Sequence, residues 1–390
     1  MVKRDLIELK QEIIKELERE IKDRSRLRKI KRDAHTKRIP IACGITVHMG
    51  FHCPFNCVYF YIEEMGFKFK ETEPYPLSGK ELALALLYNP SFVPGRNGTF
   101  IALGSIVDPF YPTVKEKTFE FIKTISTFLG NPIQFSTKMY LDEESVSRLR
   151  EVVGKNPLSP LITIITINKA KQIEPKAISP ELRFRTIENL RDFGFKPFVF
   201  IRPIIPGITD EEIDSILTSS KEYGAEGIVA GSLRVNKRIL SRLEEAGVEV
   251  HKIKNRIKGT LGDHQIVIEE TDLKKQVVQT ALRLGLLAYN SACCANAYVA
   301  NVPCYNLCFF TNRCVRCPND CISKLPTVDI TDVEYCLKAA FNVKNFSVSY
   351  NKKTIRITLK EKLNQVKRKQ VSTFIKTIFR RFVKVRVSKY

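Results

Sequence analysis

The feature that most constrains the fold of this chain is a regular alternation of strand-like and helix-like segments that starts near residue 41. Repeated strand–helix units with short connections are typical of a parallel sheet. The expected strands are Ile41–Val47, Thr99–Leu103, Ile133–Ser136, Leu161–Ile167, Pro197–Ile201 and Gly227–Ala230, and the expected helices span residues 79–88, 114–128, 141–152, 180–194, 209–223 and 236–246. The sequence therefore predicts an α/β fold whose sheet is either wound open or curled into a partial (βα)6 TIM-like barrel.

Composition limits the kind of protein that this chain can be. Of its 390 residues 44% are hydrophobic and 27% are charged, which is ordinary for a soluble globular protein. No run approaches the 18 apolar residues of a membrane span, and the charged N-terminus lacks an apolar signal core. We therefore expect a cytoplasmic protein without a membrane partner. Eleven cysteines in such a chain favour metal ligands over disulfides.

The net charge of +22 gathers at the two ends of the chain. Residues 1–40 hold 14 Lys/Arg against 8 Asp/Glu, and residues 338–390 hold 16 Lys/Arg against Glu361 alone. A nearly neutral body with basic ends predicts a nucleic-acid partner, the alternative being the lysine-rich composition of a thermophile. The C-terminal residues expected to contact the polyanion are Lys352, Lys353, Arg356, Lys367, Arg368, Lys369, Arg380 and Arg381.

The segments outside the alternation predict three further parts. Residues 3–33 have the apolar spacing of a surface helix, and their basic run from Arg24 to Arg32 fits a solvated linker as well as an RNA contact. The C-terminal pattern is helix 331–341, strand 345–350, strand 354–360, helix 364–381 and strand 382–388, with a tight turn at Asn351-Lys352. We expect a basic helical extension over 1–40, the barrel over 41–290, a cysteine-rich metal-binding segment over 291–325 and a basic α+β domain over 326–390.

Two cysteines lie in the loop after the first expected strand, within His52-Cys53-Pro54-Phe55-Asn56-Cys57-Val58-Tyr59-Phe60-Tyr61. Ligands of parallel sheets bind at the carboxyl ends of the strands, which is the edge where this loop falls. Three cysteines at spacings of four and three let one turn present three thiolates to a four-iron cluster. Phe60 stands at the third of these positions.

With these motifs the chain resembles the radical S-adenosylmethionine (SAM) superfamily, and within it the spore photoproduct lyase-like branch, over about residues 41–240. The matching runs are Cys53 to Tyr59, Gly104-Ser105-Ile106-Val107-Asp108-Pro109-Phe110-Tyr111-Pro112, Ser136-Thr137-Lys138, Thr166-Ile167-Asn168, Glu174-Pro175 and Arg202 to Asp210. The resemblance implies a 4Fe-4S cluster at Cys53 and Cys57 and a SAM molecule. It places SAM among Tyr59, Gly104, Ser105, Lys138, Thr166, Asn168 and Arg202.

Phe60 departs from the pattern of the family because its side chain has no ligand atom. Three interpretations stay open: an inactive relative whose cluster is lost or impaired, a recent or artificial change in an active enzyme, or a replacement ligand. The candidates for replacement are Cys43, His48 and His52, since imidazole also ligates iron–sulfur clusters.

A second group of cysteines follows the expected barrel. Cys304, Cys308, Cys314, Cys317 and Cys321 fall within 18 residues, just after Cys293-Cys294. Such density is unusual for core packing, and four thiolates suit a second 4Fe-4S cluster or a tetrahedral zinc ion. Redox-active or disulfide cysteines are the remaining alternative.

Two functions follow from these patterns. The first is an enzyme that reductively cleaves SAM to modify or repair a nucleic acid, with RNA favoured over DNA. Its electrons would come from a donor such as a ferredoxin. The second is an inactive protein of the same fold that acts as a metal-containing RNA- or DNA-binding module. Phe346 and Tyr350, alternating on one strand, either stack on bases or pack beneath the two helices of the module.

Overall fold

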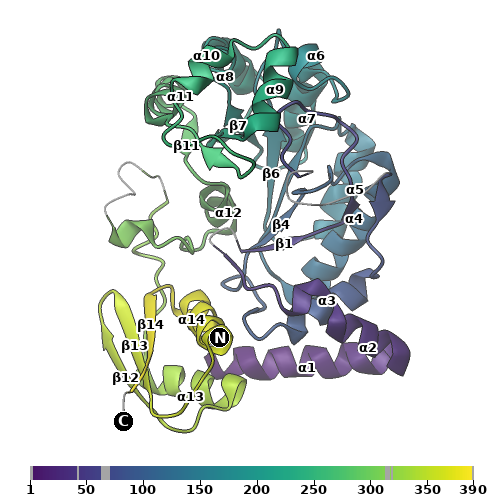
Figure 1. Cartoon of the computed structure of the whole chain (residues 1–390). Helices are drawn as coiled ribbons and strands as arrows, with labels where there is room; N and C mark the ends of the chain where they lie inside the picture. The colour runs from purple at the N-terminus through teal and green to yellow at the C-terminus, as the bar shows by residue number, and fades with distance from the viewer. Residues whose placement is uncertain (1–2, 42–43, 63–70, 312–316, 318, 389–390) are drawn as a thin grey trace.

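The computed structural model describes residues 3–41, 44–62, 71–311, 317 and 319–388. Its largest element is a parallel sheet with the strand order β1-β4-β5-β6-β7-β8-β11 (Figure 1). The strands are β1 (Ile45–Val47), β4 (Ile101–Leu103), β5 (Ile133–Thr137), β6 (Leu158–Thr163), β7 (Phe198–Ile204), β8 (Gly227–Ser232) and β11 (Leu287–Tyr289). The predicted α/β partial barrel is confirmed, with β11 as one strand more than expected.

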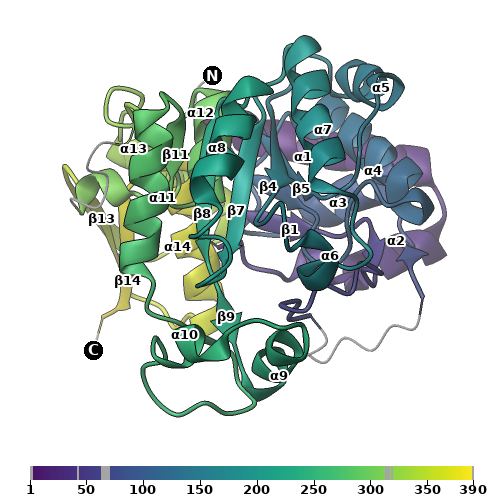
Figure 2. The same cartoon turned by 90° about the horizontal axis from the view of Figure 1, so that it is seen from above.

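Helices join consecutive strands and cover the outer face of the sheet (Figure 2). They are α3 (Gly79–Tyr88), α4 (Pro112–Thr124, continued by a π-turn over Ile125–Leu129), α5 (Glu143–Val153), α7 (Pro180–Asp192), α8 (Ile213–Glu222) and α11 (Thr271–Arg283). The start of α3 is fixed by a capping box, in which Ser78 and Glu81 satisfy each other's backbone N–H groups. The strands are rich in apolar residues because both sheet faces are buried.

The concave face of the sheet packs on a short helix, α12 (Ala292–Ala300). Alternate strand residues divide between the two faces: Ile162 and Val199 face the outer helices, whereas Leu161 and Phe198 pack with Cys293 of α12. This helix fills the half of the barrel nearest the strand starts and leaves the carboxyl ends open.

Small elements lie around the carboxyl ends of the sheet. They are two antiparallel pairs, β2 (Gly50–Phe51) with β3 (Glu73–Pro74) and β9 (Arg234–Val235) with β10 (Ile266–Val267), and the helices α6 (Ala170–Ile173), α9 (Lys237–Glu245) and α10 (Val250–Lys254). Single 3-10 turns occur at Ala34–Thr36 and Cys308–Phe310.

The C-terminal part forms a separate three-stranded sheet beneath two helices. Its elements are α13 (Ile330–Phe341), β12 (Phe346–Asn351), β13 (Thr354–Leu359), α14 (Gln365–Phe379) and β14 (Phe382–Val387). β12 and β13 pair antiparallel and β13 and β14 pair parallel, with Arg356 opposite both Ser349 and Lys384. The elements agree with the predicted module, while the domain boundaries stay predictions.

The N-terminal segment is two helices where the sequence predicted one. α1 (Lys3–Ile21) ends before Lys22, whose φ is 52°, and Asp23 caps α2 (Arg24–Arg32). The basic run therefore belongs to a helix and not to a linker. α1 lies against both α3 and α13, so that Leu17 joins the barrel core and Ile7 the C-terminal core. None of the described helices is long and apolar enough to cross a membrane.

Candidate functional site

The cysteine loop lies at the carboxyl end of β1, where the sequence placed it. The amide of Val58 donates to the carbonyl of Ile173 at 3.0 Å and that of Lys176 to the carbonyl of Phe55 at 3.2 Å, which holds the loop against α6. Burial raises the pKa of Cys53, and it raises the pKa of Cys57 to about 12. Both thiols therefore keep their protons at neutral pH until a metal displaces them.

Phe60 lines the same cavity as Cys53, at the position of the third ligand in the family pattern. Its amide donates to the carbonyl of Cys57 at 2.8 Å, and its own carbonyl accepts from Nη2 of Arg242 at 2.7 Å. The loop brings together two thiols and an aromatic ring, where the family pattern has three thiols. This donor set does not fit a cluster that needs three loop thiolates.

The candidates for a replacement ligand differ in what surrounds them. Cys43 lies outside the described residues. His52 begins the loop with a left-handed φ of 63°. His48 is buried, its Nε2 lies 3.0 Å from Nη1 of Arg38, and its Nδ1 lies 3.4 Å from Oγ of Ser105. Because the guanidinium can only donate, Nε2 of His48 accepts that bond and is not available to iron.

His48 should make the protein less stable in acid. Burial, followed by the charge of Arg38, lowers the pKa of His48 to about 3, whereas the unfolded chain has a value near 6.5. As the pH falls, His48 is therefore protonated in the unfolded state before it is protonated in the folded state. The free energy of unfolding is unaffected by this residue above pH 6.5 and decreases as the pH falls from 6.5 towards 3. Between pH 7 and pH 5 the loss from this residue is about 2 kcal/mol. Urea unfolding at pH 7 and at pH 5 measures this loss. The wild type should lose about 2 kcal/mol more than His48→Asn, because the variant has no imidazole to protonate.

A cavity of about 250 Å³ opens above α12 at the carboxyl ends of the strands. Five residues predicted to bind SAM line it: Tyr59, Gly104, Ser105, Lys138 and Arg202. Gly104 has a φ of 88°, and a Cβ on it would come within 2.6 Å of the carbonyl of Ser136, so only glycine fits.

Two predicted SAM residues, Thr166 and Asn168, lie outside this cavity, because β6 ends at Thr163 and not at residue 167. The strand also begins earlier than predicted, at Leu158 and not at Leu161. The hydroxyl of Thr166 donates to Oε1 of Glu212 at 2.8 Å, and Asn168 is exposed. The residue of β6 that lines the cavity is Thr163, which the sequence analysis missed.

A buried network of charged side chains centred on Glu174 lies next to the cavity. The hydroxyl of Tyr59 and Nη1 of Arg183 both donate to Glu174, and Nζ of Lys138 lies 3.8 Å from Oε1 of Glu174. Burial alone would raise the pKa of Glu174, but the charges of Arg183 and Lys138 outweigh burial and lower it. The network fixes Lys138 so that its ammonium meets the cavity near the cysteine loop.

Asp108 shapes the neighbouring strand end. Its Oδ1 accepts from Oγ1 of Thr137 at 2.7 Å, and its Oδ2 accepts from the amide of Lys138 at 2.7 Å. Because Asp108 is buried and both of its oxygens accept hydrogen bonds, it positions the backbone of Lys138 at the edge of the cavity that Cys53 and Phe60 line.

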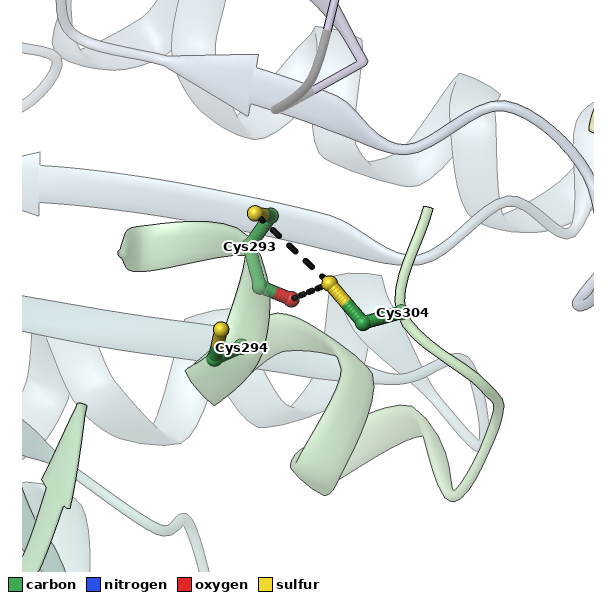
Figure 3. A group of neighbouring side chains, drawn as sticks. All are labelled: Cys293, Cys294 and Cys304. Carbon is green, nitrogen blue, oxygen red and sulfur yellow. Dashed lines mark hydrogen bonds between the residues drawn. The ribbon is translucent and has the colours of Figure 1, made fainter. Parts of the chain in front are cut away.

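The second cysteine group is arranged differently from the predicted set. Cys304 lies with Cys293 and Cys294 of α12, their three sulfur atoms all within 4.8 Å of one another (Figure 3). Of the other predicted ligands, Cys321 is buried beside Cys304, Cys308 and Cys317 are half-buried, and Cys314 lies outside the described residues. The sequence analysis placed Cys293 and Cys294 near the group but not in it.

The basic residues of the C-terminal module lie on its sheet, on its helix α14 and in its interior. Lys352, Lys353 and Arg356 are exposed on the β12–β13 hairpin, whereas Lys367, Arg368 and Lys369 lie on the first turn of α14 with Arg368 half-buried. The predicted contacts of Arg380 and Arg381 are wrong, because both side chains are buried and donate to backbone carbonyls. Lys384 and Arg386, which the prediction left out, are exposed on β14 beside Arg356.

The aromatic residues of β12 face the core of this module. Phe346 and Tyr350 are half-buried beneath α13 and α14, and the hydroxyl of Tyr350 accepts from Nε of Arg381 at 3.1 Å. The outer face of the sheet instead presents Ser347, Ser349, Arg356, Lys384 and Arg386. Such a face has groups for phosphate oxygens and lacks the aromatic pair that stacks bases on RNA-binding sheets.

Comparison with known proteins identifies the barrel. A family model described as the radical SAM superfamily matches residues 47–219, which include the cysteine loop and most of the cavity-lining strand ends. None of the curated proteins matches the sequence.

Solved structures of spore photoproduct lyase share the fold. A double mutant with bound AdoMet and dinucleoside spore photoproduct has a TM-score of 0.53 at 14% identity, over 66% of this chain and 79% of that chain. The enzyme complexed with dinucleoside spore photoproduct has a TM-score of 0.50 at 15% identity, over 62% and 74%. The family match thus places a radical SAM domain over residues 47–219 of this chain, the part that holds the cysteine loop and most of the strand ends around the cavity.

Proposed function

We propose that this chain binds SAM in the barrel cavity and acts on a nucleic acid, with RNA favoured over DNA. We further propose that Phe60 impairs binding of the iron–sulfur cluster. The observation that carries the proposal is the cavity itself, where Lys138, Ser105 and Gly104 converge beside the cysteine loop. The chemistry proposed for the intact loop is reductive cleavage of SAM to modify or repair the bound nucleic acid. The proposed partners are that nucleic acid and an electron donor such as a ferredoxin.

The cavity residues suit the polar parts of SAM. The ammonium of Lys138 matches the methionine carboxylate, and the hydroxyls of Ser105 and Thr163 match the ribose and the amino group. Gly104 lets a ligand approach the backbone closely. These contacts need no cluster, so SAM binding is expected for the chain as it stands.

Phe60→Cys tests the proposal on the enzyme. After anaerobic reconstitution with iron and sulfide, the variant should gain iron and cleave SAM to 5′-deoxyadenosine at least about 10-fold faster than the wild type. Mutating residues that only hydrogen-bond to metal ligands already changes activity about 10–100-fold, so restoring a ligand should have at least that effect. Phe60→Ala is the matched control, since it empties the same space without adding a thiolate.

The outcomes of that comparison separate the interpretations. Equal iron and equal cleavage in the wild type and Phe60→Cys would mean that another residue already supplies the third ligand. Absence of cleavage in all three proteins would refute the enzyme and leave the second candidate, an inactive metal-containing nucleic-acid-binding module. That candidate is favoured by Phe60 alone.

The outer face of the C-terminal sheet is the proposed nucleic-acid contact. Arg356, Lys384 and Arg386 are adjacent and exposed, and the hydroxyls of Ser347 and Ser349 extend the row. This face predicts binding through phosphates with little preference for sequence.

Changing Arg356, Lys384 and Arg386 together to glutamine should flatten the salt dependence of binding. Each lost phosphate contact to a single strand removes roughly 0.7 from the slope of log K against log salt, so the slope should fall by about 2. Fluorescence anisotropy with a labelled single-stranded RNA measures it. The triple variant of Lys367, Arg368 and Lys369 is the control on the helical face, and a larger effect there would move the interface to α14.

The cysteine-rich segment is proposed to hold a second metal, either an iron–sulfur cluster or a zinc ion. The clustering of three buried thiols next to the barrel supports a metal at this place.

A further inference from the structure

We infer that Cys293, Cys294, Cys304 and Cys321 bind one zinc ion that fastens α12, at the floor of the barrel cavity, to the cysteine-rich segment that leads into the C-terminal module. This inference rests on the proposed second metal and is independent of SAM cleavage. Two of its ligands, Cys293 and Cys294, come from α12 and lie outside the run of cysteines that the sequence singled out.

The sulfur positions favour a single ion over a cluster. Sγ of Cys304 lies 3.8 Å from Sγ of Cys293, and the three thiols of the group lie within 4.8 Å of one another. Zinc–sulfur bonds of about 2.3 Å in a tetrahedron separate the sulfurs by about 3.8 Å. A four-iron cluster spreads its thiolates farther apart, because each one binds a different iron. Figure 3 shows the sulfur of Cys304 turned towards the helix that carries the other two.

Cys321 is the fourth ligand by position. Its sulfur accepts from the amide of Cys304 at 3.4 Å, and its side chain is buried, whereas Cys308 and Cys317 are half-buried. A further donor faces the group, since Nδ2 of Asn306 lies 3.0 Å from Sγ of Cys293. N–H groups directed at sulfur are the surroundings that stabilise metal-bound thiolates.

A buried cation beside the thiols points independently to negative charge at this place. Arg380 is 2% exposed, and in the described part of the chain its guanidinium bonds to backbone carbonyls and to no carboxylate. Its side chain lies near the thiols of Cys304 and Cys321 and over the ring of Tyr305. A buried charge is costly without a partner, and a zinc ion with four thiolates carries two negative charges that meet this need.

The location gives the ion a structural role in the proposed function. Ala292, the first residue of α12, lines the barrel cavity, and Cys293 and Cys294 follow it directly. Arg380 at the end of α14 donates to Pro303, next to Cys304, and to Asn97 and Gly98 of the barrel. The ion would therefore hold the segment with Cys304 and Cys321 against the floor of the cavity, and Arg380 joins that segment and the barrel to α14.

Metal analysis of the full chain tests the inference. Wild type purified in zinc-containing medium should hold about one zinc ion per chain. Cys294→Ser, Cys304→Ser and Cys321→Ser should each lose most of it, whereas Cys317→Ser and Cys53→Ser should keep it. Cobalt substitution of the unmutated chain gives a second readout that needs no variant, because a tetrahedral four-thiolate site produces intense charge-transfer and visible bands.

Several results would overturn the inference. They are iron with labile sulfide at these cysteines, a disulfide between Cys304 and Cys293 or Cys294 in the purified protein, or zinc retained in Cys294→Ser and Cys321→Ser but lost in Cys317→Ser. If Phe60→Cys fails to cleave SAM while zinc depends on these four cysteines, the proposed function fails and this site stands.

Discussion

Replacing Glu174 with alanine is expected to lower the free energy of unfolding by about 3–5 kcal/mol, because it removes one member of a buried ion pair. The side chains of Glu174 and Arg183 are fully buried. Glu174 also accepts from the hydroxyl of Tyr59, and Nζ of Lys138 lies 3.8 Å from it. The variant would leave a buried guanidinium without its counter-charge, and Arg183 keeps only its bonds to the carbonyls of Ile178 and Thr163.

A matched pair on the surface gives the control. Arg148 and Glu116 also form an ion pair, with two close nitrogen–oxygen contacts, but their side chains are 44% and 70% exposed. Glu116→Ala should therefore cost less than about 1 kcal/mol. Urea unfolding of both variants at pH 7 measures the difference, and equal losses would contradict the view that burial makes the Glu174 network important. Glu174→Ala should also weaken SAM binding, since Lys138 loses the carboxylate that positions it.

Local signals account for most of the fold that the sequence predicted. The strands buried on both faces are rich in apolar residues, and α3 begins where predicted because Ser78 and Glu81 cap it. β11 was missed because Leu287–Tyr289 is only three residues long and becomes a strand by pairing with β8. The break at Lys22 between α1 and α2 has no glycine or proline to announce it.

The cavity-lining residues that could be predicted from the sequence lie at the ends of strands. Lys138 and Ser105 came from the family resemblance and lie within two residues of the ends of β5 and β4. Thr163 was missed because the strand was expected to run to Ile167, whereas it ends at Thr163. Contacts between distant segments left no local signal. Cys293 and Cys304 meet because α12 enters the barrel, and Arg380 resembles a surface residue in sequence until the fold buries it.

Arg380→Met is expected to lower the free energy of unfolding by about 3–4 kcal/mol, since it removes hydrogen bonds from a charged donor and leaves their acceptors buried. Nη2 of Arg380 donates to the carbonyls of Asn97 and Gly98, both at 3.0 Å, and Nε donates to that of Pro303 at 3.1 Å. The loss should appear as separate unfolding of the C-terminal module in calorimetry, because these bonds join α14 to the barrel.

The same variant distinguishes a buried arginine from one that binds phosphate. Arg380→Met should destabilise the chain and leave the salt slope of RNA binding unchanged, because its guanidinium faces carbonyls and thiols and not solvent. Arg356→Gln should do the reverse, with a change in stability within about 0.5 kcal/mol and a salt slope reduced by about 0.7. A lower slope in Arg380→Met at a temperature where the module is still folded would place Arg380 on the nucleic acid after all. Since both residues carry the same charge on the same module, burial alone predicts which of them acts on stability and which on binding.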